Sequence, residues 1–132
     1  MTLKDIREWL KPQIIDLNGA YIGKIDASKQ QIIGVYGRTS NSSKIAIGGL
    51  DNTSTWTKQI SILVHWNKNC DTTEVKAQEI YDLLQKYSCK PTQIGGADTY
   101  FKLLSDEPVF VGADDSDVFE YVIETQIIYK RG

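Results

Sequence analysis

Hydrophobic and polar residues alternate most regularly in residues 58–66 and 118–130. In the first stretch the apolar positions are Ile60, Ile62, Val64 and Trp66, and the positions between them are Gln59, Ser61, Leu63 and His65. In the second stretch one face holds Phe119, Tyr121, Ile123, Ile127 and Tyr129, and the other holds Glu120, Glu124, Gln126 and Lys130. A period of two residues is typical of a strand with one buried face. Both stretches therefore predict strands of a half-buried antiparallel sheet.

Two other stretches have the spacing of amphipathic helices, residues 2–10 and 69–88. In the first, the apolar residues that share one face are Leu3, Ile6, Trp9 and Leu10. Thr2 is expected to cap this helix, with Asp5 three residues later, and Pro12 limits its length. In the second, one side carries Lys76, Ile80, Leu83, Leu84 and Tyr87. Asp71 and Glu74 stand there at capping-box spacing.

The remaining segments predict shorter strands and turns. Residues 19–26 and 30–38 are expected to be two strands joined by the polar turn "ASKQ", with Gly23 and Gly34 marking bulges or close backbone approach. Residues 44–50 predict a short third strand, and residues 51–57 a loop. Residues 90–98, with Pro91 and a glycine pair, predict a turn. Two further strands, 99–107 and 108–112, precede an acidic turn and the final strand.

The order is then a helix, four strands, a helix and three strands. Strands and helices do not alternate, so a doubly wound parallel sheet is not expected. The order favours an α+β fold in which two helices pack on one face of a mostly antiparallel sheet. A length of 132 residues is ordinary for one domain, and we expect a single domain over residues 1–132.

Charge is distributed unevenly along the chain. Residues 1–66 contain 8 Lys/Arg and 5 Asp/Glu, whereas residues 67–132 contain 7 Lys/Arg and 12 Asp/Glu. The acidic residues concentrate between Asp98 and Glu124, where Lys102 is the only basic side chain. Such a surface is poorly suited to bind nucleic acid directly.

The sequence offers little catalytic chemistry. The only histidine, His65, stands five residues before Cys70, but nothing marks an oxyanion hole for a nucleophilic pair. Cys70 and Cys89 lack the spacing of metal ligands, and they flank a predicted helix about 25–28 Å long, so they should not form a disulfide. We therefore expect no catalytic, cofactor-binding or metal-binding residues, and no enzyme.

Three weaker patterns point the same way. "GRTSNSSK" lacks the second glycine of a phosphate loop and precedes a strand rather than a helix. "DDSD" lacks the glycine and distal glutamate of a calcium loop, so a solvated turn is favoured. Phe119, Tyr121 and Tyr129 share a face, as RNA-stacking aromatics do, but they more simply fill the core because basic neighbours are absent.

Three stretches together resemble the minor capsid proteins of tailed bacteriophages, in particular tail-terminator or head–tail joining subunits. "NGAYIGKIDASKQQIIGVYGR" resembles the early hairpin of that family. "ISILVHWNKNCDTTEVKAQEIYDLL" resembles its strand leading into the main helix. "PVFVGADDSDVFEYVIETQIIYKR" resembles its terminal hairpin. The resemblance spans most of the chain and carries no catalytic residues with it.

The resemblance implies a structural virion protein of a phage or prophage. It implies a homo-oligomeric ring, a hexamer, that ends the tail tube and contacts the tail-tube protein and the head connector, with DNA only as passing cargo. The competing functions are a small nucleic-acid-binding module and a small enzyme. The N-terminus mixes charged and apolar residues and no stretch could span a membrane, which predicts that the protein is made in the cytoplasm of the host. The resemblance implies a place in the virion, at the head–tail junction. The acidic loop Ala113–Asp117 either lines the channel, where it repels DNA, or lies on the outer rim.

Overall fold

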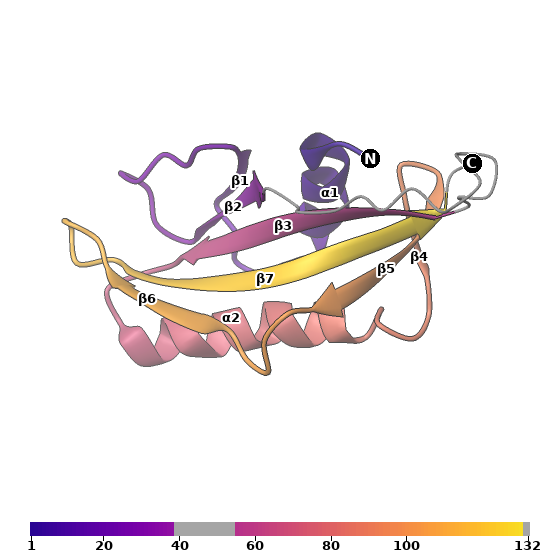
Figure 1. The fold of residues 1–132 in the computed structure, drawn as a ribbon. Helices are drawn as coiled ribbons and strands as arrows, with labels where there is room; N and C mark the ends of the chain where they lie inside the picture. Colours follow the sequence, from indigo (N-terminus) through magenta and orange to yellow (C-terminus); the bar gives the residue numbers. More distant parts are fainter. Residues whose placement is uncertain (39–54, 131–132) are drawn as a thin grey trace.

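The computed structural model describes residues 1–38 and 55–130. Figure 1 shows one curved sheet with the helices behind it. The elements in chain order are α1 (Leu3–Leu10), the short 3₁₀ helix η1 (Lys11–Gln13), β1 (Gly19–Ile22), β2 (Ile32–Gly37), β3 (Thr55–His65), α2 (Cys70–Gln85), β4 (Thr92–Ile94), β5 (Ala97–Leu103), β6 (Val109–Ala113) and β7 (Phe119–Lys130).

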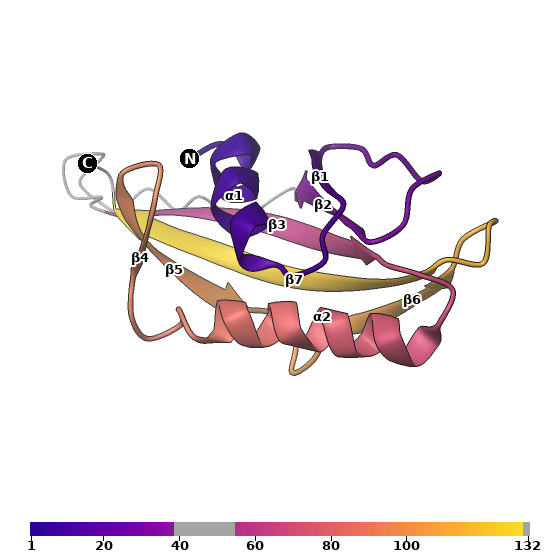
Figure 2. The same ribbon diagram turned by 180° about the vertical axis from the view of Figure 1, so that it is seen from behind.

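Within residues 1–38 and 55–130 the strands form a seven-stranded sheet in the order β1-β2-β3-β7-β5-β4, and β6 also pairs with β7. The two long strands β3 and β7 pair along their whole length, from Thr55↔Lys130 to His65↔Glu120. All pairings are antiparallel except that of β1 with β2. Both helices lie on the same face of the sheet, as the two opposite views show (Figures 1 and 2). The predicted α+β class and arrangement are therefore confirmed.

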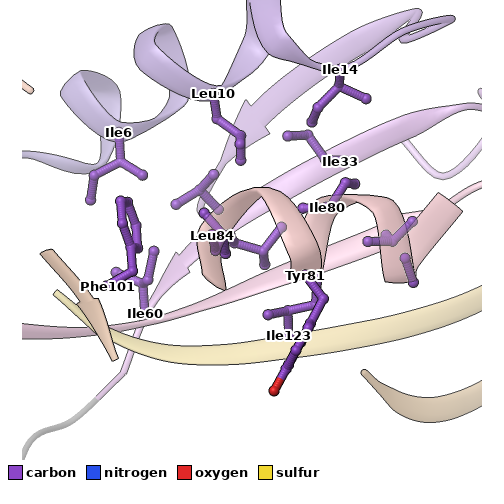
Figure 3. Close-up of a cluster of buried hydrophobic side chains, with 14 of the residues drawn as sticks. Ile6, Leu10, Ile14, Ile33, Ile60, Ile80, Tyr81, Leu84, Phe101 and Ile123 are labelled. Carbon is purple, nitrogen blue, oxygen red and sulfur yellow. The ribbon is translucent and has the colours of Figure 1, made fainter. Parts of the chain in front are cut away.

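The core lies between the helices and this face of the sheet. Side chains from α1, α2 and the strands converge there (Figure 3). The fully buried members include Ile6, Leu10, Ile33, Ile60, Ile62, Val64, Leu84, Ile123 and Ile127. The predicted faces of β3 and β7 are confirmed, because the alternate apolar residues of both strands belong to this core. Burying these side chains contributes about 1.5–3 kcal/mol each and dominates the stability of the fold.

The first helix is capped as its sequence predicts. The Thr2 hydroxyl accepts the Asp5 N–H at 3.2 Å, and the Asp5 carboxylate accepts the Thr2 N–H at 2.9 Å. Trp9 then stacks on Phe101 of β5 at a centroid distance of 5.1 Å and donates from its indole N–H to Thr92 at 3.0 Å. The α1 stripe is therefore core packing that ties the helix to β4 and β5.

The predicted cap of the second helix is wrong. Asn69, not Asp71, precedes the helix, and its side-chain oxygen accepts the Thr72 N–H at 3.0 Å. Asp71 lies in the first turn, where its negative charge favours the positive end of the helix. Asn and Asp are about equally favoured as helix N-caps. Because Asn69 and Asp71 lie two residues apart, the sequence allowed the helix to begin after either of them.

Three strand predictions also need correction. Residues 19–26 and 30–38 do not form a hairpin, because β1 runs parallel to β2. The predicted turn 90–98 contains β4, which pairs with β5 across the Gly95–Gly96 turn. β3 begins at Thr55, inside the predicted loop 51–57. The predicted strand 44–50 lies outside the described residues. No helix in the described part of the chain is long and apolar enough to cross a membrane.

Candidate assembly surface

The strand β6 is an exposed apolar edge of the sheet. Val109, Phe110 and Val111 are 46%, 55% and 52% exposed. Among the described strands, β6 pairs only with β7, so its other edge has no partner. Exposed apolar residues on an unpaired strand edge favour pairing with another chain, and natural monomers usually protect such edges with charges or proline. No charged residue interrupts this strand, so β6 has the character of an interface.

The apolar side chains of β6 point to both faces of the sheet. Phe110 lies on the helix side, with its ring 5.3 Å from that of Tyr121. Val109 is the cross-strand neighbour of Val122, on the helix-free side. Between Phe110 and Gly112 the pairing shifts by a bulge, and Gly112 has a φ of 126°. The exposed strand therefore offers apolar contacts to a partner on both of its faces.

A groove runs beside β6 on the helix side. It has a volume of about 320 Å³ and is lined by Glu74, Val75, Gln78, Glu107, Pro108 and Tyr121. Val75 of α2 is 51% exposed and continues the apolar surface of β6. The Tyr121 hydroxyl donates to Glu74 at 3.2 Å and lies 3.9 Å from the Cys70 sulfur. Burial raises the pKa of Tyr121, and its contacts with Cys70 and Glu74 raise it further, so the phenol is neutral at physiological pH.

The acidic turn that follows β6 is more structured than a solvated loop. One oxygen of Asp114 accepts the N–H groups of Ser116 at 2.9 Å and Val118 at 3.0 Å. Asp117 holds a positive φ of 64°, a conformation that Asp tolerates in turns. Asp115 and Asp117 are exposed, whereas Asp114 is only partly so. Of the three aspartates, one therefore serves the turn and two face solvent.

The lone histidine is buried between this turn and the sheet. His65 has no exposed side-chain surface, and its Nδ1 lies 2.9 Å from Oε2 of Glu120. Its Nε2 lies 3.7 Å from Oδ2 of Asp114 and has no hydrogen-bond partner among the described residues. The two carboxylates flank opposite nitrogens of the ring, so the three groups do not share a common metal position. The cluster instead holds the turn against the end of β3.

The structure separates the residues that the sequence offered for chemistry. Cys70 lies near Tyr121 on the helix face, whereas His65 faces Glu120 on the opposite face, so the two are not a nucleophilic pair. Cys70 and Cys89 are both free and exposed. No group of three metal-ligating side chains occurs in residues 1–38 and 55–130. Apart from Gly37 and Arg38, the stretch "GRTSNSSK" lies outside the described residues.

The aromatic face proposed for RNA is not available for stacking. Tyr121 is 5% exposed, and Tyr129 packs against the core beneath the helices. The sequence reasoning predicted β6 as the strand 108–112, but it missed that this strand is an exposed apolar edge. The three consecutive apolar residues Val109, Phe110 and Val111 place apolar side chains on both faces of this short strand, a pattern that indicates burial on both sides and could have drawn attention to the strand.

Comparison with known proteins identifies one family. Residues 4–131 match the sequence profile described as "Bacteriophage tail terminator protein". No curated protein gives a significant match. Among solved structures, one whose title states no function aligns with 98% of this chain and 89% of its own, with 12% identity and a TM-score of 0.44.

Proposed function

The chain belongs to the bacteriophage tail terminator protein family and has a structural role in the phage tail, and from this premise we propose that it is the subunit of a homo-oligomeric ring. The ring, a hexamer, ends the tail tube and contacts the tail-tube protein and the head connector. In this proposal the subunit is a virion component of the head–tail junction and assembles in the cytoplasm of the host.

The observation that carries the proposal is the exposed apolar strand β6. In a closed ring each subunit uses one patch to contact a different patch on its neighbour. Val109, Phe110 and Val111 form one such patch at the edge of the sheet, and Val75 extends it across the groove. Covering these side chains in a ring removes the apolar surface that the monomer exposes to water.

Light scattering and negative-stain microscopy test the ring. Over a wide concentration range the protein should form a species with a mass near six times the 14.9 kDa of the chain, visible as rings. A Val109→Thr, Val111→Thr variant should shift this equilibrium toward the monomer, because it removes apolar surface and keeps β-branched side chains. The matched control is Ile15→Thr, which changes an exposed apolar residue that lies neither on β6 nor in the groove. A protein that stays monomeric at all concentrations and is missing from purified tails overturns the proposal.

DNA enters this proposal only as cargo. Residues 103–118 contain five Asp/Glu and no Lys/Arg, so phosphate contacts are disfavoured there. Whether Asp115 and Asp117 line the channel or lie on the outer rim does not alter the subunit's role. The protein should pass a DNA column without retention at physiological salt, and retention there would favour the nucleic-acid-binding alternative.

A further inference from the structure

One end of the sheet forms a continuous row of five strands. Cross-strand neighbours link Tyr21 of β1 to Gly34, Gly34 to Leu63, Leu63 to Val122, and Val122 to Val109 of β6. β1 and β6 are therefore the two opposite edges of the same row. Among the described strands, β1 pairs only with β2 and β6 only with β7, so both edges lack partners.

The two edges differ in charge. Residues 103–118, around β6, contain five acidic and no basic side chains, whereas the loop 23–31 after β1 contains Lys24, Lys29 and only one acid, Asp26. The Asp26 carboxylate is occupied by the N–H and hydroxyl of Ser28, at 3.2 and 2.6 Å. Exposed apolar residues stand on both edges, with Ile22 of β1 38% exposed. The edges are complementary in charge and alike in apolar character.

We propose that β6 of one copy pairs with β1 of the next copy, so that the sheet continues from subunit to subunit. This inference rests on the proposed ring. β1 runs parallel to β2, and three antiparallel steps separate β2 from β6, so β1 and β6 run in opposite directions. Rotation about a ring axis that lies roughly along the strands preserves strand direction. The neighbour's β1 then arrives antiparallel to β6, which gives a regular antiparallel ladder.

This pairing gives a hydrogen-bonding partner to the outer edge of both β1 and β6. It provides partners for the free backbone N–H and C=O groups of β6, and it covers Val109 and Val111 with another strand. In this antiparallel ladder the C-terminal end of β1, with Lys24 two residues beyond it, meets the N-terminal end of β6, which Asp106 and Glu107 of the adjacent copy precede. Because the contact joins two different edges, it propagates around a ring rather than closing a pairwise dimer.

Cysteine cross-linking tests the pairing directly. In a Cys70→Ser, Cys89→Ser background, Ile22→Cys is combined with Val109→Cys or Val111→Cys and the protein is oxidised. Within one chain β1 and β6 are four strand spacings apart, about 19 Å. A disulfide needs Cα atoms within about 7 Å, so any disulfide must join two copies. Non-reducing electrophoresis should then show a ladder of covalent oligomers up to the size of the ring.

The matched control replaces the β1 position with Gln93→Cys on β4, an exposed residue at a different edge, and it should give no ladder. Two results would show that the β1–β6 pairing is wrong while the ring itself stands. In one, rings form but cross-links appear only with the Gln93→Cys control. In the other, rings form but neither the Ile22→Cys nor the Gln93→Cys combinations cross-link. If neither rings nor cross-links form at any concentration, the ring itself is wrong.

A charge exchange gives a second, independent measurement. Lys24→Glu with Lys29→Glu should weaken ring assembly by about 3- to 10-fold, since each exposed ion pair contributes little. Adding Asp106→Lys and Glu107→Lys should restore assembly, because the attraction is then reversed rather than lost. Failure of the second pair to restore assembly, with the fold intact by circular dichroism, contradicts the pairing.

Discussion

The Nδ1 of His65 lies 2.9 Å from Oε2 of Glu120, its direct cross-strand neighbour. His65 has no exposed side-chain surface, and the Glu120 side chain is only 16% exposed. A polar pair removed from water in this way is costly to break on one side, because the remaining partner stays desolvated. The contact therefore locks β3 to β7 at the end of the sheet from which β6 and the acidic turn extend.

Replacing Glu120 measures how much its contact with His65 contributes to the free energy of unfolding. We expect Glu120→Ala to lower the free energy of unfolding by about 1–3 kcal/mol, because His65 loses its partner. Glu120→Gln should cost less, since its side-chain oxygen can still accept from the ring. Denaturant unfolding measures both, with Gln126→Ala on the same face of β7 as a control that should change stability by less than about 0.5 kcal/mol. If Glu120→Ala and Glu120→Gln lower the free energy of unfolding equally, the hydrogen bond to His65 is not the source of the stabilisation.

The acidic turn should respond differently at neighbouring aspartates. Asp114→Ala removes an acceptor of two backbone N–H groups, so we expect a loss of about 1–2 kcal/mol in the free energy of unfolding. Asp115→Ala, one residue away and exposed, should change it by less than about 0.5 kcal/mol. Thermal or denaturant unfolding of the two variants gives the comparison. Similar stabilities for both would contradict the role assigned to Asp114.

The cap of α1 should depend on pH. Thr2→Ala is expected to lower the free energy of unfolding by about 1 kcal/mol at neutral pH. Hydrogen bonds from Thr2 hold the pKa of Asp5 below its ordinary value of 3.8. Because the folded pKa is the lower one, the contribution of Asp5 is fully present well above pH 3.8 and is lost as the pH falls through the folded pKa.

Unfolding of the wild type and Asp5→Ala at pH 6 and pH 3 checks this dependence. The two proteins should differ more at pH 6 than at pH 3. A stability difference that stays constant between these pH values would exclude a carboxylate cap.

Two glycines of β2 offer a matched test of packing. A Cβ at Gly34 would lie 2.6 Å from Cγ2 of Ile25 and 2.8 Å from Cε2 of Tyr36, whereas at Gly37 the nearest atom is Cδ1 of Leu3 at 4.0 Å. We expect Gly34→Ala to lower the free energy of unfolding by about 1–3 kcal/mol through overpacking. Gly37→Ala should be neutral or slightly stabilising, because it fits and restricts the unfolded chain. Chemical denaturation measures the free energy of unfolding of both variants. If Gly34→Ala is as stable as the wild type, the loop before β2 can shift to make room for the added methyl group.

The sequence by itself determined the features that depend on near neighbours along the chain. Alternation at Ile60, Ile62 and Val64 placed the buried face of β3, because successive side chains of a strand point to opposite faces. The spacing of Thr2 and Asp5 placed the first cap, because a capping box closes within one helical turn. The acidic residues between β6 and β7 placed a turn. These local interactions are encoded by the type and spacing of a few residues.

Only the tertiary structure decided which strands pair and what the edges expose. Alternation assigns a face to β1 and β2 but no partner or direction, so the same letters fit a hairpin and a parallel pair. His65 was left as an ordinary strand residue, because its two carboxylate neighbours, Glu120 and Asp114, lie about fifty residues away in sequence. The exposure of β6 depends on the order of all the strands in the sheet, because that order determines which strands lie at its edges. The physical reason is that cross-strand pairing and burial are set by contacts between distant segments, which no local pattern contains.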